Sequence, residues 1–241
     1  MRVSRIFTQQ VLTSGATVNL EQRATRYLSQ VLRLRSGDKI VLFDGSGGDF
    51  QAELTRCDRK ACTARVAGLA RQEHPTELQL HLGVGVSRGE RMDFVIQKSV
   101  ELGVTAITPL LTERSLVQFR SDRQEKRMAH WQGVLLSACE QSGRSLIPSL
   151  RSPAALPDWF VAHHDGLVFD HRVTRTLPDL PHPGTSLNLL VGPEGGLSQE
   201  ERSQATAAGF TAVRLGPRVL RTETAPLAAL AAIQVLWGDL R

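Results

Sequence analysis

The sequence predicts an α/β protein in which a small β-barrel precedes a parallel sheet covered by helices. Up to about Ala70, short apolar runs are separated by turn residues, which is typical of a compact β-domain. Beyond the polar segment Arg71–Glu77, apolar runs of strand length alternate with segments of helical periodicity. Such alternation favours a parallel sheet with helices on both faces. We therefore expect two domains, residues 1–72 and 73–241.

The first domain is expected to contain a β-hairpin. The apolar runs 39–43 and 50–54 flank the segment 44–49, which contains three glycines. Glycine readily adopts the positive φ values of a tight turn, so this order predicts two antiparallel strands. A strand over 61–67 and a short helix over 21–31 complete the predicted barrel.

The second domain begins with a predicted strand over 78–86. A helix over 90–102 follows, because Met92, Val95, Ile96 and Val100 fall on one helical face. A second helix is expected around Trp131, where the same spacing recurs. The remaining strands are expected over 105–111, 166–170, 187–191 and 212–215, and the remaining helices over 199–208 and 224–237.

The charge of the chain favours an anionic partner. The formal net charge is +5, and all but four of the 29 Lys and Arg residues are arginine. The planar arginine fork suits phosphates and base edges, so RNA or DNA is a natural partner. Arginine-heavy codon usage in a GC-rich genome explains the same bias, and composition does not separate the two.

The cysteines and apolar segments bear on location. Cys57, Cys62 and Cys139 cannot all pair within one chain and show no metal-ligand spacing with histidines, which predicts reduced thiols and no metal. The first ten residues lack an apolar run of signal-peptide length. The apolar stretch 226–237 is too short to span a bilayer and predicts a buried helix. We expect a cytoplasmic protein without a membrane segment.

Two unusual loops follow predicted strands, at the edge where open α/β sheets bind ligands. The loop 189–198 has three glycines in five residues, which lets backbone groups approach a ligand closely. An ordinary strand-to-helix turn would explain these glycines, but Glu194 among them favours a binding loop. The loop lacks the lysine and hydroxyl residue of a phosphate-binding loop. The earlier Gly83 and Gly85 lack dinucleotide spacing and are interpreted as packing glycines.

The second loop covers residues 214–226. Leu215, Gly216 and Leu220 would form apolar walls beside the cluster 221–223, Arg-Thr-Glu. Such walls suit a flat, neutral base with its sugar, as in the adenosine end of a cofactor. A surface ion pair between Arg221 and Glu223 at a helix start is the competing interpretation.

Several separated strings resemble the ribosomal RNA small subunit methyltransferase E family. The most specific are Val-Gly-Pro-Glu-Gly-Gly-Leu-Ser at 191–198 and Leu-Gly-Pro-Arg-Val-Leu-Arg-Thr-Glu-Thr-Ala at 215–225. Further matches lie at 91–104, 112–115 and 140–144, and in the first domain at 31–38 and 42–45. Together they extend over nearly the whole chain. The chain departs from the family pattern at Arg26-Tyr27, Arg88 and Pro226.

The resemblance implies a SPOUT-type methyltransferase domain with a C-terminal trefoil knot, a feature that ordinary topology rules would reject. It also implies a PUA-like barrel that holds RNA, a homodimer, and S-adenosyl-L-methionine as cofactor. The implied reaction is methylation of N3 of a uridine in small-subunit (16S) ribosomal RNA, within a ribosomal particle.

The resemblance also implies site residues. One of the carboxylates Glu194 and Glu223 would be the general base, the two not being distinguished, and Arg221 would stabilise the developing anion. The residues expected to bind the cofactor are Phe169, Gly192, Pro193, Gly195, Gly196, Leu215, Gly216, Leu220 and Thr222. The residues expected to contact RNA are Arg2, Arg5, Arg33, Arg35, Arg88, Glu140, Gln141 and Arg144. For the last three of these, the cofactor rim or a merely polar helix end are alternatives.

Two other classes of function compete. The chain could be a non-catalytic RNA-binding module with a decayed pocket, although the intact loops 192–196 and 221–223 argue against decay. A nucleotide-dependent oxidoreductase or ATPase is disfavoured because phosphate-loop chemistry is missing.

Overall fold

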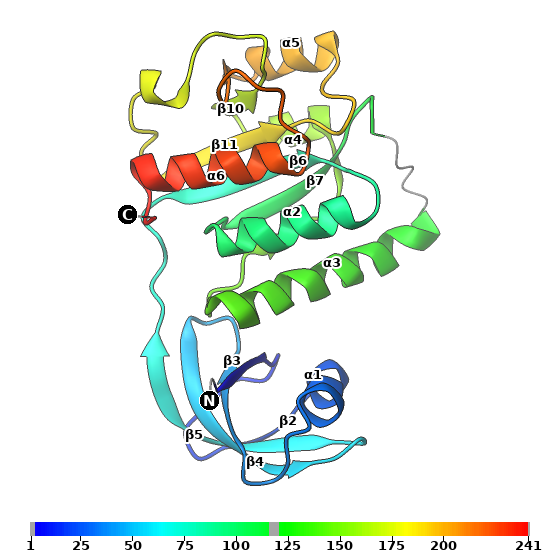
Figure 1. Cartoon of the computed structure of the whole chain (residues 1–241), viewed down its shortest axis with the longest axis vertical. Helices are drawn as coiled ribbons and strands as arrows, with labels where there is room; N and C mark the ends of the chain where they lie inside the picture. The colour runs from blue at the N-terminus through cyan, green and yellow to red at the C-terminus, as the bar shows by residue number, and fades with distance from the viewer. Residues whose placement is uncertain (1–2, 116–120, 241) are drawn as a thin grey trace. The chain divides into compact units, whose positions relative to one another are not determined.

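The computed structural model describes residues 3–115 and 121–240 and divides the chain into two compact units (Figure 1). Unit 1 comprises Met1–Pro75 together with Cys139–Ile147, and unit 2 comprises Thr76–Ala138 and Pro148–Arg241. The predicted division into 1–72 and 73–241 assigned the segment 139–147 to the second domain. In the structure, this segment groups with unit 1.

Unit 1 is built on one five-stranded sheet with the order β1-β3-β4-β5-β2. The strands are β1 (Ser4–Phe7), β2 (Thr17–Asn19), β3 (Lys39–Phe43), β4 (Gly48–Cys57) and β5 (Cys62–Gln72). The predicted hairpin is confirmed as the antiparallel pair β3 and β4. Strand β5 extends to Gln72 and so includes part of the predicted linker. Ile6, Leu28, Ile40, Leu42 and Leu54 lie fully inside the core.

The predicted helix of unit 1 is formed by two consecutive segments. The α-helix α1 (Gln22–Arg26) continues into one π-helical segment, η1 (Tyr27–Val31). Beyond it, the amide of Leu34 donates to the carbonyl of Leu28 at 2.9 Å, and Arg33 between them has φ +56°. This is the left-handed helix ending that normally uses glycine. A non-glycine residue there costs about 1–2 kcal/mol.

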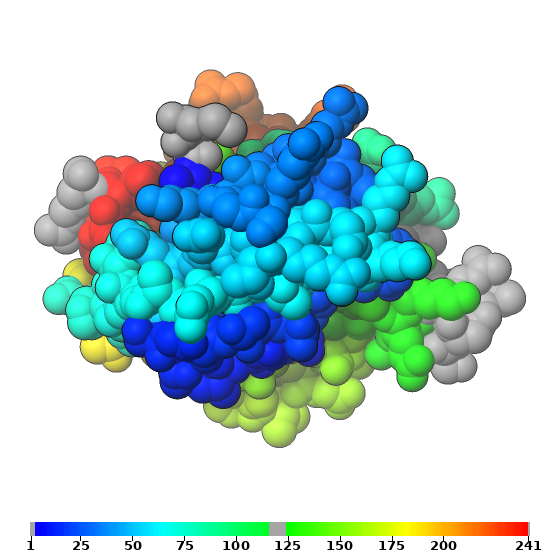
Figure 2. All heavy atoms as spheres, turned by 90° about the horizontal axis from the view of Figure 1, so that it is seen from below, coloured from blue at the N-terminus to red at the C-terminus, as the bar shows by residue number. Residues whose placement is uncertain are grey.

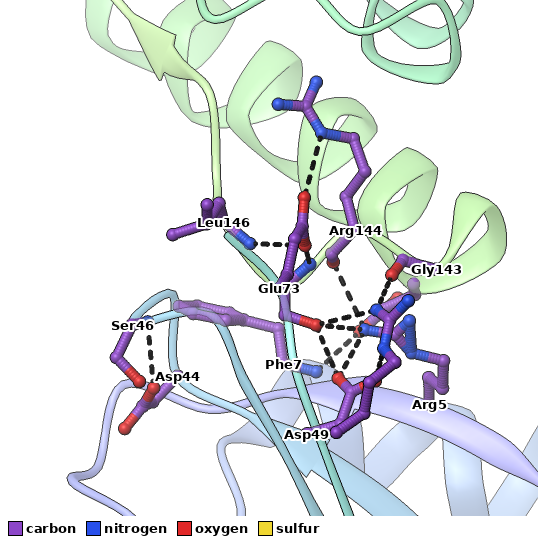
Figure 3. Close-up of polar contacts among 12 residues, drawn as sticks. Arg5, Phe7, Asp44, Ser46, Asp49, Glu73, Gly143, Arg144 and Leu146 are labelled. Carbon is purple, nitrogen blue, oxygen red and sulfur yellow. Dashed lines mark hydrogen bonds and ion pairs between the residues drawn. The ribbon is translucent and has the colours of Figure 1, made fainter. Parts of the chain in front are cut away.

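A buried charge cluster attaches the segment 139–147 to unit 1 (Figure 3). The carboxylate of Asp49 accepts hydrogen bonds from Arg5 Nη2 at 2.8 Å, Arg71 Nε at 3.0 Å and Ser145 Oγ at 2.5 Å. Glu73 accepts from the amides of Ser145 and Leu146. Burial lowers the pKa of Arg5, while the nearby Asp49 carboxylate opposes this shift. These bonds from Asp49 and Glu73 fix the segment 139–147 to unit 1.

The cysteine interpretation is corrected. Strand pairing places Cys57 opposite Cys62 at the end of the β4–β5 hairpin, and the structure joins them in a disulfide. Cys139 is a free, buried thiol, and burial raises its pKa to about 12. The prediction of reduced thiols was therefore wrong for two of the three cysteines, and cysteine usage no longer supports a cytoplasmic location.

Unit 2 contains a parallel sheet with the order β12-β10-β11-β6-β7-β8, and β9 also pairs with β7. The predicted parallel sheet is thus confirmed. Its strands are β6 (Gln79–Gly85), β7 (Ala106–Leu111), β8 (Ser149–Leu150), β9 (Ala154–Ala155), β10 (Gly166–Phe169), β11 (Ser186–Val191) and β12 (Phe210–Val213). The short strands β8 and β9 were not predicted.

The helices of unit 2 cover this sheet. They are α2 (Glu90–Glu101), α3 (Ser121–Ser142, of which the last turn belongs to unit 1), α4 (Leu156–Ala162), η2 (Leu177–Asp179), α5 (Gln199–Ala207) and α6 (Thr224–Trp237). Helices α2 and α6 lie side by side (Figure 1). Helix α4, which was not predicted, packs against α5 and β7. Among the helices of the described residues, none is long and apolar enough to cross a membrane.

The interpretation of Gly83 and Gly85 as packing glycines is confirmed. A Cβ atom on Gly83 would lie 2.7 Å from the Trp159 ring. A Cβ atom on Gly85 would lie 2.5 Å from the backbone nitrogen of Pro193. Strand β6 therefore passes directly against the loop that follows β11.

Candidate functional site

A cavity of about 480 Å³ lies at the carboxyl ends of the parallel strands of unit 2. This volume is within the usual range of small-molecule sites, about 300–1,000 Å³. It is lined by the loops that follow β10 and β11 and by the segment before α6. Seven of the nine residues expected to bind a cofactor line it: Phe169, Gly192, Pro193, Gly195, Gly196, Leu220 and Thr222.

The other two expected residues lie in neighbouring hollows. Leu215 lines an adjoining cavity of about 80 Å³ together with Phe169 and Leu220. Leu215 and Gly216 also line an open groove of about 560 Å³ between η2 and α6. The two loops predicted to lie at the carboxyl edge of the sheet therefore do meet at one pocket. The second loop also lines the two neighbouring hollows.

The glycine loop turns back on itself at Gly196. Its amide donates to the carbonyl of Pro193 at 2.8 Å, and its φ is +66°. A Cβ atom at this position would meet no other atom within 4 Å. The space beside Gly196 is therefore open for a ligand, whereas a Cβ on Gly192 would lie 2.9 Å from the amide of Leu197.

A capping box fixes the far end of this loop. Ser198 Oγ accepts from the amide of Glu201, and the Glu201 carboxylate accepts from the amide of Ser198. The other oxygen of Glu201 accepts from the amide of Glu113 at 2.8 Å. The buried Glu201 side chain therefore holds the loops after β7 and β11 together.

Thr222 joins the two predicted loops. Its hydroxyl donates to the carbonyl of Gly192 at 3.0 Å and lies 3.3 Å from the hydroxyl of Ser87. Thr222 is 9% exposed, so the bond is shielded from water. The pocket wall is thereby continuous from β11 to α6.

Arg91 lies near both candidate bases. Its Nη1 donates to Glu194 Oε1 at 3.0 Å, and its Nε lies 3.9 Å from Glu223 Oε2. Burial by itself would raise the pKa of Glu194, but hydrogen bonds from the Arg88 amide and Arg91, with the charge of Arg91, bring it below its ordinary value. Glu194 is thus held as a carboxylate. Glu194 lines the pocket, and its second carboxylate oxygen is buried and has no hydrogen-bond partner among the described residues.

Arg221 lines the same pocket and is exposed. Its backbone carbonyl accepts from the amides of Thr224 and Ala225 at the start of α6. Within the described part of the chain, its guanidinium makes no hydrogen bond or ion pair. The proposed alternative, a surface ion pair with Glu223, is therefore not formed.

The prediction missed Arg91 as a site residue. The Asp170 carboxylate lies 3.5 Å from Arg172 Nη1 and 3.7 Å from Arg202 Nε, at the edge of the pocket. Arg91 closely follows the predicted strand 78–86, so the rule that ligands bind beyond the carboxyl ends of parallel strands could have identified it. Among the described residues, no group of three or more His, Cys, Asp or Glu is placed to hold a metal ion.

The residues expected to contact RNA have different environments. Arg33 and Arg35 are exposed on unit 1, as is Gln141, whereas Arg5 and Arg144 belong to the charge cluster with only 14% of each side chain exposed. Arg2 lies outside the described residues.

Two further residues of this group have partners in the structure. Glu140 forms a two-pronged ion pair with Arg23, at 2.7 and 2.9 Å, and also accepts from the amide of Phe7. The backbone amide of Arg88 donates to Glu194. The contacts of Glu140 give it a structural role in unit 1.

Two family models match the chain. The RNA methyltransferase domain matches residues 73–234, and the RNA methyltransferase PUA domain matches residues 20–67. The first therefore covers the whole pocket, and the second covers most of the unit 1 sheet.

Characterised relatives and solved structures agree with these models. The ribosomal RNA small subunit methyltransferase E of Buchnera aphidicola (from Schizaphis graminum) is 34% identical over 99% of this chain and 98% of its own length. The enzyme of that name from Synechocystis is 35% identical over 92% of this chain and 74% of its own.

Two solved structures match this chain over its full length and over the full length of their own chains. That of ribosomal RNA small subunit methyltransferase E from Neisseria gonorrhoeae, bound to S-adenosyl methionine, has a TM-score of 0.92 at 41% identity. A Legionella pneumophila methyltransferase with bound cofactor SAM has a TM-score of 0.96 at 38% identity.

Proposed function

The chain belongs to the ribosomal RNA small subunit methyltransferase E family, and from this premise we propose that it methylates N3 of a uridine in small-subunit (16S) ribosomal RNA with S-adenosyl-L-methionine as cofactor. One observation carries the proposal. The pocket combines an open glycine turn, a buried unpaired carboxylate oxygen and an unpartnered arginine at the start of α6.

The pocket fits this cofactor. The turn at Gly196 leaves room for a ligand beside the backbone, and Leu220 and Phe169 offer apolar surface to an adenine ring. The unpaired oxygen of Glu194 suits the ammonium group or the sulfonium charge, because a buried carboxylate oxygen gains most from a cation. When bound, S-adenosylmethionine supplies an electrophilic methyl group.

The residues at the pocket have separate tasks in this proposal. Uridine N3 carries a proton, so the chain must remove it and stabilise the negative charge that develops on the ring oxygens. The lowered pKa of Glu194 makes it a weak base, so its role is to hold positive charge. Glu223 takes the N3 proton, and Arg221 donates hydrogen bonds to the developing anion. Arg91 orients both carboxylates.

The finer features of the fold belong to the same proposal. The C-terminal part of unit 2 forms the trefoil knot of SPOUT enzymes. The strand order supports this, since the chain leaves β11, crosses back and forms β12 on the far side of β10. The sheet of unit 1 closes as a PUA-like barrel that holds RNA, with Arg33 and Arg35 on its surface.

The protein works as a homodimer. The groove of about 560 Å³ between η2 and α6 is lined almost entirely by apolar groups, and Val235 and Leu236 on α6 are 55% and 40% exposed. An apolar surface of this kind, on the last helix, suits a second copy of the chain. The substrate is a ribosomal particle, which places the protein in the cytoplasm.

Methyl transfer in vitro tests the proposal. Purified protein, labelled S-adenosylmethionine and small-subunit particles lacking the modification should give label in the ribosomal RNA, located at uridine N3 by nucleoside analysis. Binding of the cofactor and of RNA without any transfer would favour the non-catalytic RNA-binding module instead. A labelled methyl group on a different atom of the RNA would contradict methylation at N3 but not the methyltransferase activity.

A further inference from the structure

Unit 1 carries an exposed aromatic side chain within a strongly basic segment. Residues 22–37 contain Arg23, Arg26, Arg33 and Arg35 but no aspartate or glutamate. Tyr27 lies near the middle of the segment, is the sole tyrosine of the chain and is 42% exposed. Among the described residues of unit 1, no other phenylalanine, tyrosine or tryptophan is classed as exposed.

The backbone presents Tyr27 from a fixed position. Tyr27 and Val31 begin and end the π-helical segment η1, and the amide of Leu32 closes it on the Tyr27 carbonyl at 2.9 Å. Leu28 beside it is completely buried, whereas Val31 is 67% exposed. The core thus anchors the turn while its apolar outer side chains face solvent. Such π-helical turns occur frequently at functional sites. Figure 2 shows the blue segment that contains η1 at the surface of unit 1.

Arg33 adds a second, independent observation. It occupies the left-handed position at the end of the helix, where glycine would be free of strain. Its side chain is exposed and, among the described residues, makes no hydrogen bond or ion pair. The same holds for the guanidinium groups of Arg26 and Arg35. A strained arginine whose guanidinium has no hydrogen bond or ion pair within the described residues points to a partner outside the chain.

We propose that Tyr27 is a stacking platform for an unpaired RNA base, and that Arg26, Arg33 and Arg35 bind the adjacent phosphates. The proposal rests on the proposed function for its choice of RNA as the partner, and it specifies the contact within unit 1. Duplex RNA buries the faces of its bases, whereas single-stranded loops expose them to aromatic side chains and arginines. An exposed ring, in a segment with three guanidinium groups that have no hydrogen bond or ion pair within the described residues, therefore fits single-stranded RNA.

Fluorescence anisotropy with a short labelled single-stranded RNA, and a duplex of the same sequence as control, tests this on the full chain. Tyr27→Ala should weaken single-strand binding about 5- to 100-fold, the usual effect of losing one stacked base. Tyr27→Trp should keep the affinity, and Tyr27→Leu should bind as weakly as Tyr27→Ala. Leu69→Ala, at a 56% exposed position on β5, is the matched control and should bind normally.

Arg33→Gly separates recognition from folding. Glycine relieves the left-handed strain, so the melting temperature should stay or rise, while RNA affinity falls and the salt slope decreases by about 0.7 per lost phosphate contact. Wild-type affinity in folded Tyr27→Ala would overturn the stacking role. Full affinity in Tyr27→Leu would overturn it as well, because leucine keeps apolar surface but has no ring to stack on a base. These binding measurements use a short RNA and do not depend on methyl transfer, so they test the stacking role by itself. Failure of methyl transfer on ribosomal particles would instead count against the proposed function.

Discussion

Thr222 Oγ1 donates a hydrogen bond to the carbonyl oxygen of Gly192, 3.0 Å away, and so joins two loops that are 30 residues apart in the chain. The bond is shielded from water and lies at the wall of the pocket. Each loop carries part of the site, with Glu194 on one and Arg221 on the other. The hydrogen bond between Thr222 and Gly192 therefore helps to set the geometry of the pocket.

Thr222→Val should weaken cofactor binding about 2- to 10-fold. Valine keeps the shape of threonine but cannot donate, which costs about 0.5–1.5 kcal/mol and leaves the Gly192 carbonyl without its partner. Isothermal titration with S-adenosylmethionine measures the effect. Thr224→Val, at the exposed first residue of α6, is the control and should bind normally. Equal affinity of the two variants would show that the contact does not shape the pocket.

Arg221→Ala should reduce turnover about 100- to 1,000-fold and leave the cofactor dissociation constant within about threefold of the wild type. A donor that acts mainly on charge developing in the transition state affects kcat more than ground-state binding. Gly196→Val should do the reverse, because its side chain enters the open space at a left-handed position. Near-normal turnover in Arg221→Ala would move the stabilising role to another residue.

Val235→Arg should convert the proposed homodimer into a monomer. The side chain lies on the apolar groove beside α6, where a buried unpaired charge opposes association. Light scattering at micromolar concentration gives the mass directly. Val161→Arg, at a 77% exposed position on α4, should remain a dimer. A monomeric mass for the unmodified protein would contradict the proposed assembly.

Acid should destabilise unit 2 through His81. Burial, with the charges of His163 and Arg151, lowers the pKa of His81 to about 4, and its Nε2 lies 2.7 Å from Thr108 Oγ1. The unfolded chain takes up the proton near pH 6.5, so stability is full above that pH and is lost as the pH falls toward 4.

Urea unfolding at pH 7.5 and pH 5 measures this loss. The His81 contribution at pH 5 is about 2 kcal/mol. Glutamine cannot take up a proton, so the free energy of unfolding of His81→Gln should fall by about 2 kcal/mol less than that of the wild type between pH 7.5 and pH 5. His164→Gln, at an exposed position, should retain the full acid sensitivity. Identical acid sensitivity in the wild type and His81→Gln would show that His81 is not the source of the acid-induced loss of stability.

Much of unit 2 could be predicted because its signals are local. The apolar run 187–191 and the cap Ser198 fix β11 and α5 almost to the residue, and the start of α6 was predicted at Thr224. The edge rule for parallel strands then brought the two loops to one pocket. Helix α4 was missed because its buried residues Leu156, Trp159 and Phe160 occupy a segment too short to show a period.

The rest depended on contacts between distant segments. The segment 139–147 joins unit 1 through contacts of Ser145 with Asp49 and of Leu146 with Glu73, 96 and 73 residues apart, and no local pattern encodes that pairing. The Cys57–Cys62 bond depends on the register of β4 and β5. Arg91 was missed as a site residue because its relation to Glu194 spans 103 positions.

The decisive test of the proposed activity is nucleoside mass spectrometry of ribosomal RNA from cells with and without this protein. We expect N3-methyluridine to be present in small-subunit RNA of the complete strain, absent without the protein, and restored by the wild-type chain but not by Arg221→Ala. An unchanged level of N3-methyluridine in the strain that lacks the protein would contradict it.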